Sequence, residues 1–195
     1  MLPPEVIAPV VTGFHGPSRI AANCILKEGY VVSSNEYDWL GDGVYFFLDA
    51  PIRASELAKA RYGDEFAVVE SRIQLADCMD LLDIKWASIL SDAYNQFIGR
   101  VKKLNVPVPR QTEGAHRLDR EVINYCIGLL KENGILIKCV RAAFSECRPV
   151  FPNSALFDRA HVQIAVRDLS IIKNICIPSQ SQEVRECWIS QESRV

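Results

Sequence analysis

Short apolar runs typical of β-strands occur near both ends of this chain, and their distribution restricts the fold more than any other feature of the sequence. Strand and helix patterns do not alternate regularly, as they would in a parallel α/β sheet. We expect strands at residues 10–14, 44–48, 66–75, 135–140, 162–166 and 171–177. The sequence therefore predicts an α+β fold, with a helical insertion at about 83–134 between segments of sheet.

Residues that usually begin or end helices mark the helical segments. Pro17-Ser18 opens a helical stretch that Gly29 ends, and Asp49-Ala50-Pro51 places a proline at the first position of the next helix. Apolar residues at helical spacing continue these patterns. We expect the later helices at residues 51–61, 82–104 and 116–132.

The composition is that of a folded domain. The chain has 195 residues, 49% of them hydrophobic, so it can bury a substantial core. We place one domain at 1–178 and a polar C-terminal tail at 179–195. The net charge of −2, without a block of Lys or Arg, gives no reason to expect nonspecific binding to nucleic acid or membranes.

The cysteines and the N-terminus bear on where such a chain resides. None of the seven cysteines forms a CxxC pair, so we expect reduced thiols and no metal site. The N-terminus does not resemble a signal peptide, and no apolar run approaches the roughly 20 residues of a membrane span. We expect a cytoplasmic protein without membrane contact.

Two residues at the first expected strands could form part of a ligand site. His15 ends the first strand, and Gly16 follows it, where a missing side chain lets a ligand approach the main chain. Tyr45 lies inside the strand at 44–48 and offers a flat ring for stacking. Taken alone, each residue also has an ordinary structural explanation.

A third candidate, Gln163, lies in the strand at 162–166. Strand alternation places it on the same face as His161 and Ala165. A buried amide in such a strand needs hydrogen-bond partners. The alternative is an edge strand whose polar face is solvated.

Together these segments resemble the ADP-ribosyltransferases of the diphtheria-toxin and poly-ADP-ribose-polymerase type, whose signature is His, Tyr and usually Glu on three strands. His15 in Gly-Phe-His-Gly matches the first residue. Tyr45 in Gly-Asp-Gly-Val-Tyr-Phe matches the second, and Gln163 stands at the third. The resemblance covers residues 10–82 and 160–177, and the segment 83–155 has no counterpart.

The resemblance implies a split antiparallel β core with flanking helices and NAD as a substrate. His15 would hydrogen-bond the adenosine-side ribose, and the backbone of Gly16 would hold the nicotinamide carboxamide. Tyr45 would stack on the nicotinamide ring, and Gln163 would contact the nicotinamide-side ribose. Tyr37 or Trp39 could supply a second ring from the loop before the second strand.

This chain departs from the family pattern at several positions. Gln163 replaces Glu, which implies transfer of a single ADP-ribose unit rather than a polymer. Arg53 stands where the polymerase branch has a serine, and Glu56 stands where it has a second stacking aromatic. The catalytic base is unassigned, and Glu56 and Asp38 are the first candidates to mutate.

The resemblance implies a mono-ADP-ribosyltransferase that modifies a protein or nucleic-acid acceptor. It is similar to small bacterial toxins and phage-defence effectors, which often occur with an antitoxin. An NAD glycohydrolase and a non-catalytic module that binds NAD or ADP-ribose are the alternatives. Basic residues between 100 and 120 could dock a nucleic-acid acceptor, although solvated helix faces explain them equally well.

Overall fold

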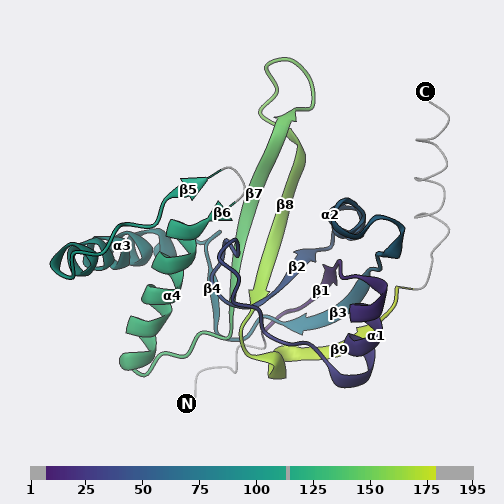
Figure 1. Cartoon of the computed structure of the whole chain (residues 1–195), viewed down its shortest axis with the longest axis horizontal. Helices are drawn as coiled ribbons and strands as arrows, with labels where there is room; N and C mark the ends of the chain where they lie inside the picture. The colour runs from purple at the N-terminus through teal and green to yellow at the C-terminus, as the bar shows by residue number, and fades with distance from the viewer. Residues whose placement is uncertain (1–7, 113–114, 179–195) are drawn as a thin grey trace, which may run out of the picture.

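The computed structural model describes residues 8–112 and 115–178, and its main element is a seven-stranded sheet (Figure 1). The strand order is β4-β7-β8-β2-β1-β3-β9, and every neighbouring pair is antiparallel except β4 and β7. The strands are β1 (Val10–His15), β2 (Val44–Leu48), β3 (Val69–Gln74), β4 (Cys78–Asp80), β7 (Cys139–Pro149), β8 (Phe157–Val166) and β9 (Ile172–Cys176).

Helices and short elements complete the described part of the chain. Gly63–Glu65 and Leu169–Ile171 form single 3₁₀ turns, and β5 and β6 pair as a separate small ladder. The α-helices and the small strands are α1 (Arg19–Glu28), α2 (Pro51–Tyr62), α3 (Lys85–Lys103), α4 (Arg117–Glu132), β5 (Gln111–Thr112) and β6 (Ala115–His116). None of the helices in these ranges is long and apolar enough to cross a bilayer.

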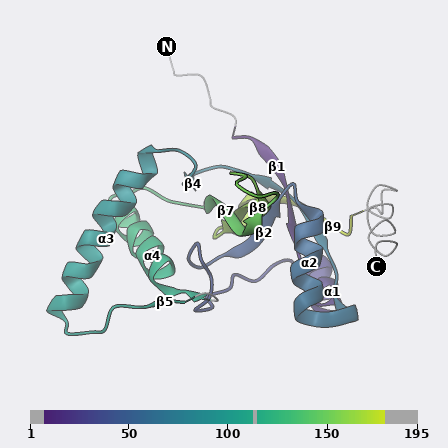
Figure 2. The ribbon, with the colours of Figure 1, turned by 90° about the horizontal axis from the view of Figure 1, so that it is seen from above.

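The helices lie in two groups at opposite ends of the sheet, as Figure 2 shows from above. α3 and α4 pack against β4, β7 and β8, through a core that includes Met79, Ile123 and Ala165. α1 covers the other half, where Ala22 packs with Phe46 and the strands around it. α2 packs on Phe14 and Phe47 in a third, smaller cluster. The α+β architecture predicted from the sequence is therefore confirmed.

Strand β8 lies inside the sheet and separates two of these cores. Ile164 and Val166 belong to the core beneath α1, whereas Ala165 belongs to the core beneath α4. The alternative of an edge strand with a solvated polar face is wrong, because β8 pairs with β7 on one side and β2 on the other. Both backbone edges of β8 are thereby hydrogen-bonded.

The structure agrees with most of the expected elements and extends two of them. Ser18 caps α1 by accepting a hydrogen bond from the Ala21 N–H at 3.2 Å, and Gly29 ends the helix as expected. The strand expected at 135–140 begins only at Cys139 and continues to Pro149. The short parallel strand β4 was not expected at all, because three residues are too few to show an alternating pattern.

The extension of β7 and β8 forms a hairpin that projects beyond the rest of the molecule (Figure 1). Its tip carries the exposed apolar side chains Val150, Phe151 and Leu156. Its stem pairs Phe144 with His161 and Ala142 with Gln163. The expected tail at 179–195 lies outside the described residues.

Candidate active site

A cleft of about 1190 Å³ lies against strands β1, β2, β7 and β8, on the side of the sheet where α1 and α2 supply lining residues. Its walls come from segments far apart in the sequence, including the loop 30–43, α2 and the stem of the β7–β8 hairpin. The sequence-predicted site residues all line it: His15, Gly16, Tyr37, Trp39, Tyr45 and Gln163. Long-range pairing of the strands brings them together.

His15 ends β1 with its imidazole held on one side. Nδ1 donates a hydrogen bond to the carbonyl oxygen of Tyr45 at 2.8 Å, because a carbonyl can only accept. The ring packs against Tyr30 and Phe46, at 5.7 and 5.9 Å between ring centroids. Burial lowers the pKa of His15, and the Tyr45 carbonyl only partly opposes this. His15 is therefore a neutral imidazole whose Nε2 can accept a hydrogen bond from a ligand hydroxyl.

Gly16 is needed first for packing against α2. A Cβ at this position would lie 2.5 Å from the carbonyl oxygen of Ala54 and 2.8 Å from the Cβ of Ala58. Both alanines are completely buried. The close approach of β1 and α2 therefore explains the glycine without any ligand, although Gly16 also lines the cleft.

The hydroxyl of Tyr45 is hydrogen-bonded to the backbone of the loop that precedes strand β2. It accepts a hydrogen bond from the Leu40 N–H and donates one to the Gly41 carbonyl, each at 2.7 Å. Burial raises the pKa of Tyr45, so the phenol stays protonated. The ring, rather than the hydroxyl, is what Tyr45 can offer to a ligand.

Three side chains from outside the loop hold the Gly41-Asp42-Gly43 turn in place. Arg120 donates to the Asp42 carboxylate at 2.7 Å, and Arg167 donates to the Asp42 carbonyl at 2.8 Å. Asn124 accepts from the Asp42 N–H at 3.1 Å. Gly41 adopts a φ of 80°, and a Cβ there would lie 2.5 Å from the Asn124 side-chain oxygen. Gly41 is thus required by the shape of the loop itself.

Tyr37 and Trp39 form the aromatic rim of the cleft. Trp39 packs on His116, with 3.9 Å between ring centroids, and against the edge of Phe144 at 4.9 Å. Tyr37 is about half exposed, and the Arg61 guanidinium lies 5.6 Å from its ring centroid. Both residues line the cleft as expected, and the ring of Tyr37 is the more exposed of the two.

Gln163 lies in the middle of the sheet, between Phe47 of β2 and Ala142 of β7. Its side-chain nitrogen lies 2.8 Å from Nε2 of His161. His161 in turn uses Nδ1 to donate to the Arg159 carbonyl at 3.0 Å. The amide of Gln163 therefore has a partner within its own strand.

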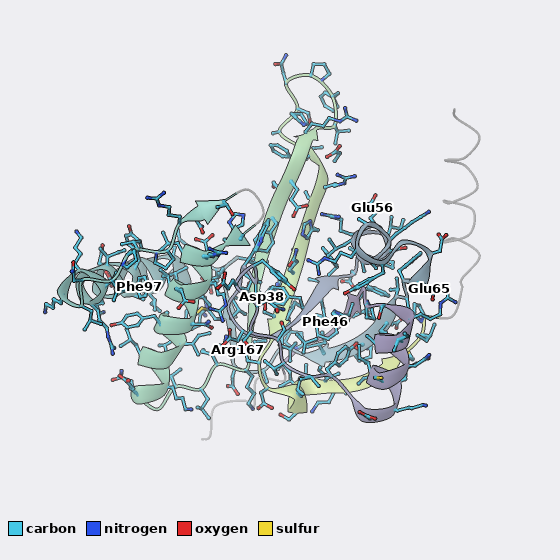
Figure 3. The ribbon with its side chains drawn as sticks, in the orientation of Figure 1. Asp38, Phe46, Glu56, Glu65, Phe97 and Arg167 are labelled. Atoms are coloured by element: carbon cyan, nitrogen blue, oxygen red, sulfur yellow. The ribbon has the colours of Figure 1, made fainter. Side chains whose placement is uncertain are left out.

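Of the two candidate catalytic bases, Asp38 lines the cleft and Glu56 does not. Asp38 lines the cleft and is buried, and its carboxylate accepts hydrogen bonds from the Ser33 hydroxyl and the Asn35 N–H. Burial raises the pKa of Asp38. Glu56 is not among the cleft-lining residues, and it pairs instead with Arg53 and Arg159 at 3.5 and 3.6 Å. Figure 3 shows Asp38 near the centre of the molecule and Glu56 on α2.

The structure adds a carboxylate that the sequence did not suggest. Glu146 of β7 lines the cleft and forms an ion pair with Arg53 of α2. The pair joins the α2 wall of the cleft to the β7 wall. Arg53 was visible in the sequence as a departure from the family pattern. Glu146 was not, because residues 83–155 match no part of that pattern.

No cluster of His, Cys, Asp or Glu in the described ranges is suited to a metal ion. Neither the protein-family models nor the curated proteins contain a match to this chain.

Proposed function

We propose that this chain is a mono-ADP-ribosyltransferase that uses NAD as its donor and modifies a macromolecular acceptor. One observation carries the proposal: six residues selected from sequence motifs in three separate segments line the same cleft. The cleft, at about 1190 Å³, is larger than the roughly 300–1,000 Å³ typical of sites for small ligands. It therefore has room for an extended dinucleotide.

The protonation states in the cleft support the binding of NAD through a ribose hydroxyl and the nicotinamide ring. His15 presents an unprotonated Nε2, which can accept a hydrogen bond from a ribose hydroxyl. Tyr45 offers a ring whose position is set by two hydrogen bonds of its hydroxyl. A stacked ring and a hydrogen-bonded ribose would orient NAD before reaction.

In the proposed reaction, the bond between the nicotinamide nitrogen and C1′ of the ribose breaks, and nicotinamide leaves with the bonding electrons. Positive charge develops at C1′, and an acceptor nucleophile then forms the new bond to C1′ while losing its proton. Negative or strongly dipolar groups near C1′ would stabilise the charge. Gln163 supplies an amide dipole rather than a full charge at the third motif position.

Glu146 is the carboxylate that we propose for this electrostatic role. It comes from a wall of the cleft that also carries Gln163, since both lie on paired strands in the hairpin stem. Arg53 holds the carboxylate in an ion pair, so the charge is oriented but partly compensated. Asp38 is a weaker candidate, because its carboxylate already accepts two hydrogen bonds that order the loop.

The deciding experiment uses NAD labelled on the adenylate phosphate, incubated with the purified protein and a cell lysate. Label that is retained on macromolecules, together with release of nicotinamide, supports the proposal. Protease and nuclease digestion then separate protein from nucleic-acid acceptors. Free ADP-ribose without macromolecular label would indicate an NAD glycohydrolase, and binding without nicotinamide release would indicate a non-catalytic module. Absence of both binding and turnover would refute every NAD-based function.

Matched variants test whether the transfer activity depends on a residue of the cleft. Glu146→Gln is expected to lower transfer about 100- to 1000-fold, since removing one electrostatic contact to a developing charge costs about 2.7–4 kcal/mol in well-studied sites. Glu70→Gln is the control, because Glu70 is a partly buried strand glutamate on β3 outside the cleft lining. Equal activity in both variants would remove Glu146 from the proposal.

The biological role is part of the same proposal. We propose a toxin or phage-defence effector, for which an antitoxin would be the natural partner. Induced expression of the wild-type chain and of His15→Ala in a bacterial host tests this role. Growth arrest by the wild type alone supports it, and unimpaired growth of both strains argues against a toxin.

A further inference from the structure

His161 lies directly behind Gln163 and is buried, although it is not among the cleft-lining residues. Its ring lies between Phe47 and Phe144, at 5.0 and 5.8 Å between centroids. The imidazole contacts Arg159 and Gln163 through its two ring nitrogens. A buried histidine with both nitrogens engaged sets the orientation of whatever it touches.

The carbonyl of Arg159 determines which ring nitrogen carries the proton. A carbonyl oxygen only accepts, so His161 Nδ1 is the donor in the 3.0 Å contact. Burial lowers the pKa of His161, so the ring is neutral near pH 7 and Nε2 has no proton. Nε2 is therefore an acceptor, and the group that faces it at 2.8 Å must be the NH₂ end of the Gln163 amide.

This hydrogen bond fixes which end of the amide remains available. The amide nitrogen of Gln163 is hydrogen-bonded to His161. The amide oxygen is therefore the end of the side chain that remains available to the cleft that Gln163 lines. Within the described ranges no side chain or N–H donates to that oxygen. An amide oxygen in this orientation accepts hydrogen bonds, as the glutamate of the family motif would.

We propose that His161 is a positioning residue that keeps the side-chain oxygen of Gln163 turned towards the cleft, where it accepts a hydrogen bond from a hydroxyl of the nicotinamide-side ribose. The inference rests on the proposed function for its ligand. The orientation of the amide, by contrast, is a property of the protein alone. It can be measured without NAD.

Protonation of His161 would reverse the orientation of the Gln163 amide. A protonated ring donates from both nitrogens, and the NH₂ of Gln163 cannot accept, so the amide would rotate and place its oxygen on His161. The NH₂ end would then face the cleft. The charged groups that act on the ring are Arg53 from α2 and Glu146 from β7, and Glu56 of α2 pairs with both Arg53 and Arg159. Glu146 raises the pKa of His161 and Arg53 lowers it, while burial is the larger effect.

The first test is nuclear magnetic resonance of the free protein with ¹⁵N-labelled side chains. We expect His161 to be the neutral tautomer with the proton on Nδ1 at pH 7.5. The NH₂ signals of Gln163 should shift at the same midpoint as the His161 ring when the pH is lowered. The opposite tautomer, or a Gln163 amide that does not follow the histidine, would overturn the inference whether or not the protein turns over NAD.

The second test compares His161→Phe with His161→Gln. The phenylalanine keeps a ring between Phe47 and Phe144 but removes the acceptor, so kcat/KM should fall about tenfold, the size expected for one net hydrogen bond. The glutamine places a non-titrating oxygen near the position of Nε2 and should restore most of the rate. It should also remove the decline of kcat/KM that His161 causes in the wild type at low pH.

A double-mutant cycle separates positioning from general damage to the fold. In a Gln163→Ala background, His161→Phe should have little further effect on kcat/KM, because the amide that His161 orients is gone. Equal effects of His161→Phe in both backgrounds would show that the histidine acts independently of Gln163. If the wild type fails to turn over NAD, the proposed function fails, while the resonance experiment still decides the orientation.

Discussion

At the scale of single residues, the cleft is lined by polar groups whose own partners set what they can offer. His15 donates from Nδ1 to a backbone carbonyl and keeps an unprotonated Nε2. His161, which does not line the cleft, also donates from Nδ1 to a carbonyl, and its Nε2 is engaged by Gln163. The hydroxyl of Tyr45 is hydrogen-bonded to the loop backbone. These residues thus present acceptors and ring faces, which suit a ribose and a nicotinamide ring.

Tyr45→Phe tests whether the hydroxyl is structural. The substitution leaves the Leu40 N–H and the Gly41 carbonyl without their side-chain partner, so the free energy of unfolding should fall by about 1–3 kcal/mol. Affinity for NAD should change less, because the ring remains. Denaturant unfolding and an NAD titration measure the two effects. Tyr37→Phe, at a half-exposed ring on the cleft rim, is the control and should leave stability nearly unchanged.

The lowered pKa values of His15 and His161 predict a dependence of stability on pH. Burial lowers the pKa of both His15 and His161 in the folded chain, whereas an unfolded histidine titrates near 6.5. Between these values the unfolded chain binds more protons, so the free energy of unfolding should decrease as the pH falls below about 6.5. Urea unfolding at pH 7.5 and 5.5 measures the loss. His161→Gln should reduce it, and an unchanged slope in that variant would contradict the assignment.

At the scale of elements, the cleft depends on how closely α2 and the loop before β2 approach the sheet. Gly16 allows α2 to contact β1, and Gly41 allows the loop to contact Asn124 of α4. Arg53 then joins α2 to β7 through Glu146. Gly16 and Gly41 therefore act through packing between elements, which sets the separation of the cleft-lining side chains.

Gly16→Ala should move α2 and destabilise the protein. The added Cβ meets the Ala54 carbonyl at 2.5 Å, and overpacking of this kind costs about 1–3 kcal/mol. Gly99→Ala is a matched control in α3, where nothing lies within 4 Å of the new Cβ; it should stabilise by about 0.5–1 kcal/mol. Thermal unfolding of both variants measures the difference. A neutral Gly16→Ala would show that α2 does not lie as close to β1 as described.

At the scale of the whole molecule, the sheet brings distant segments to one cleft. The end of the β7–β8 hairpin projects beyond the rest of the described chain (Figure 1). The stem carries Glu146 and Gln163 into the cleft wall. The tip carries exposed apolar residues that contribute little to either core. Mutations in the stem and in the tip should therefore differ in their effects on stability and on NAD affinity.

Replacing residues 150–156 with Asn-Gly tests whether the hairpin tip is independent of the cleft. Pro149 and Phe157 pair across the hairpin and can flank a two-residue turn of that sequence. Because the removed apolar side chains are more than half exposed, the free energy of unfolding should change by no more than about 1 kcal/mol. NAD affinity should not change. A large loss of either property would mean that the tip supports the cleft.

The sequence alone determined the local structure and the chemical candidates. Strand β2 and the helix capped by Ser18 and Gly29 were predictable because short-range patterns specify them. His15, Tyr45 and Gln163 could be selected because their motifs are local and ordered along the chain. The predicted NAD chemistry of these residues stays a prediction until the transfer experiment is done.

Only the tertiary structure decided which residues meet and in what chemical state. The parallel pairing of β4 with β7, the internal position of β8 and the Arg53–Glu146 pair all join segments far apart in the chain. No local pattern encodes such contacts, because they depend on how whole strands align. Burial likewise decided that His15 and His161 are neutral, since a pKa depends on surroundings supplied by the entire fold.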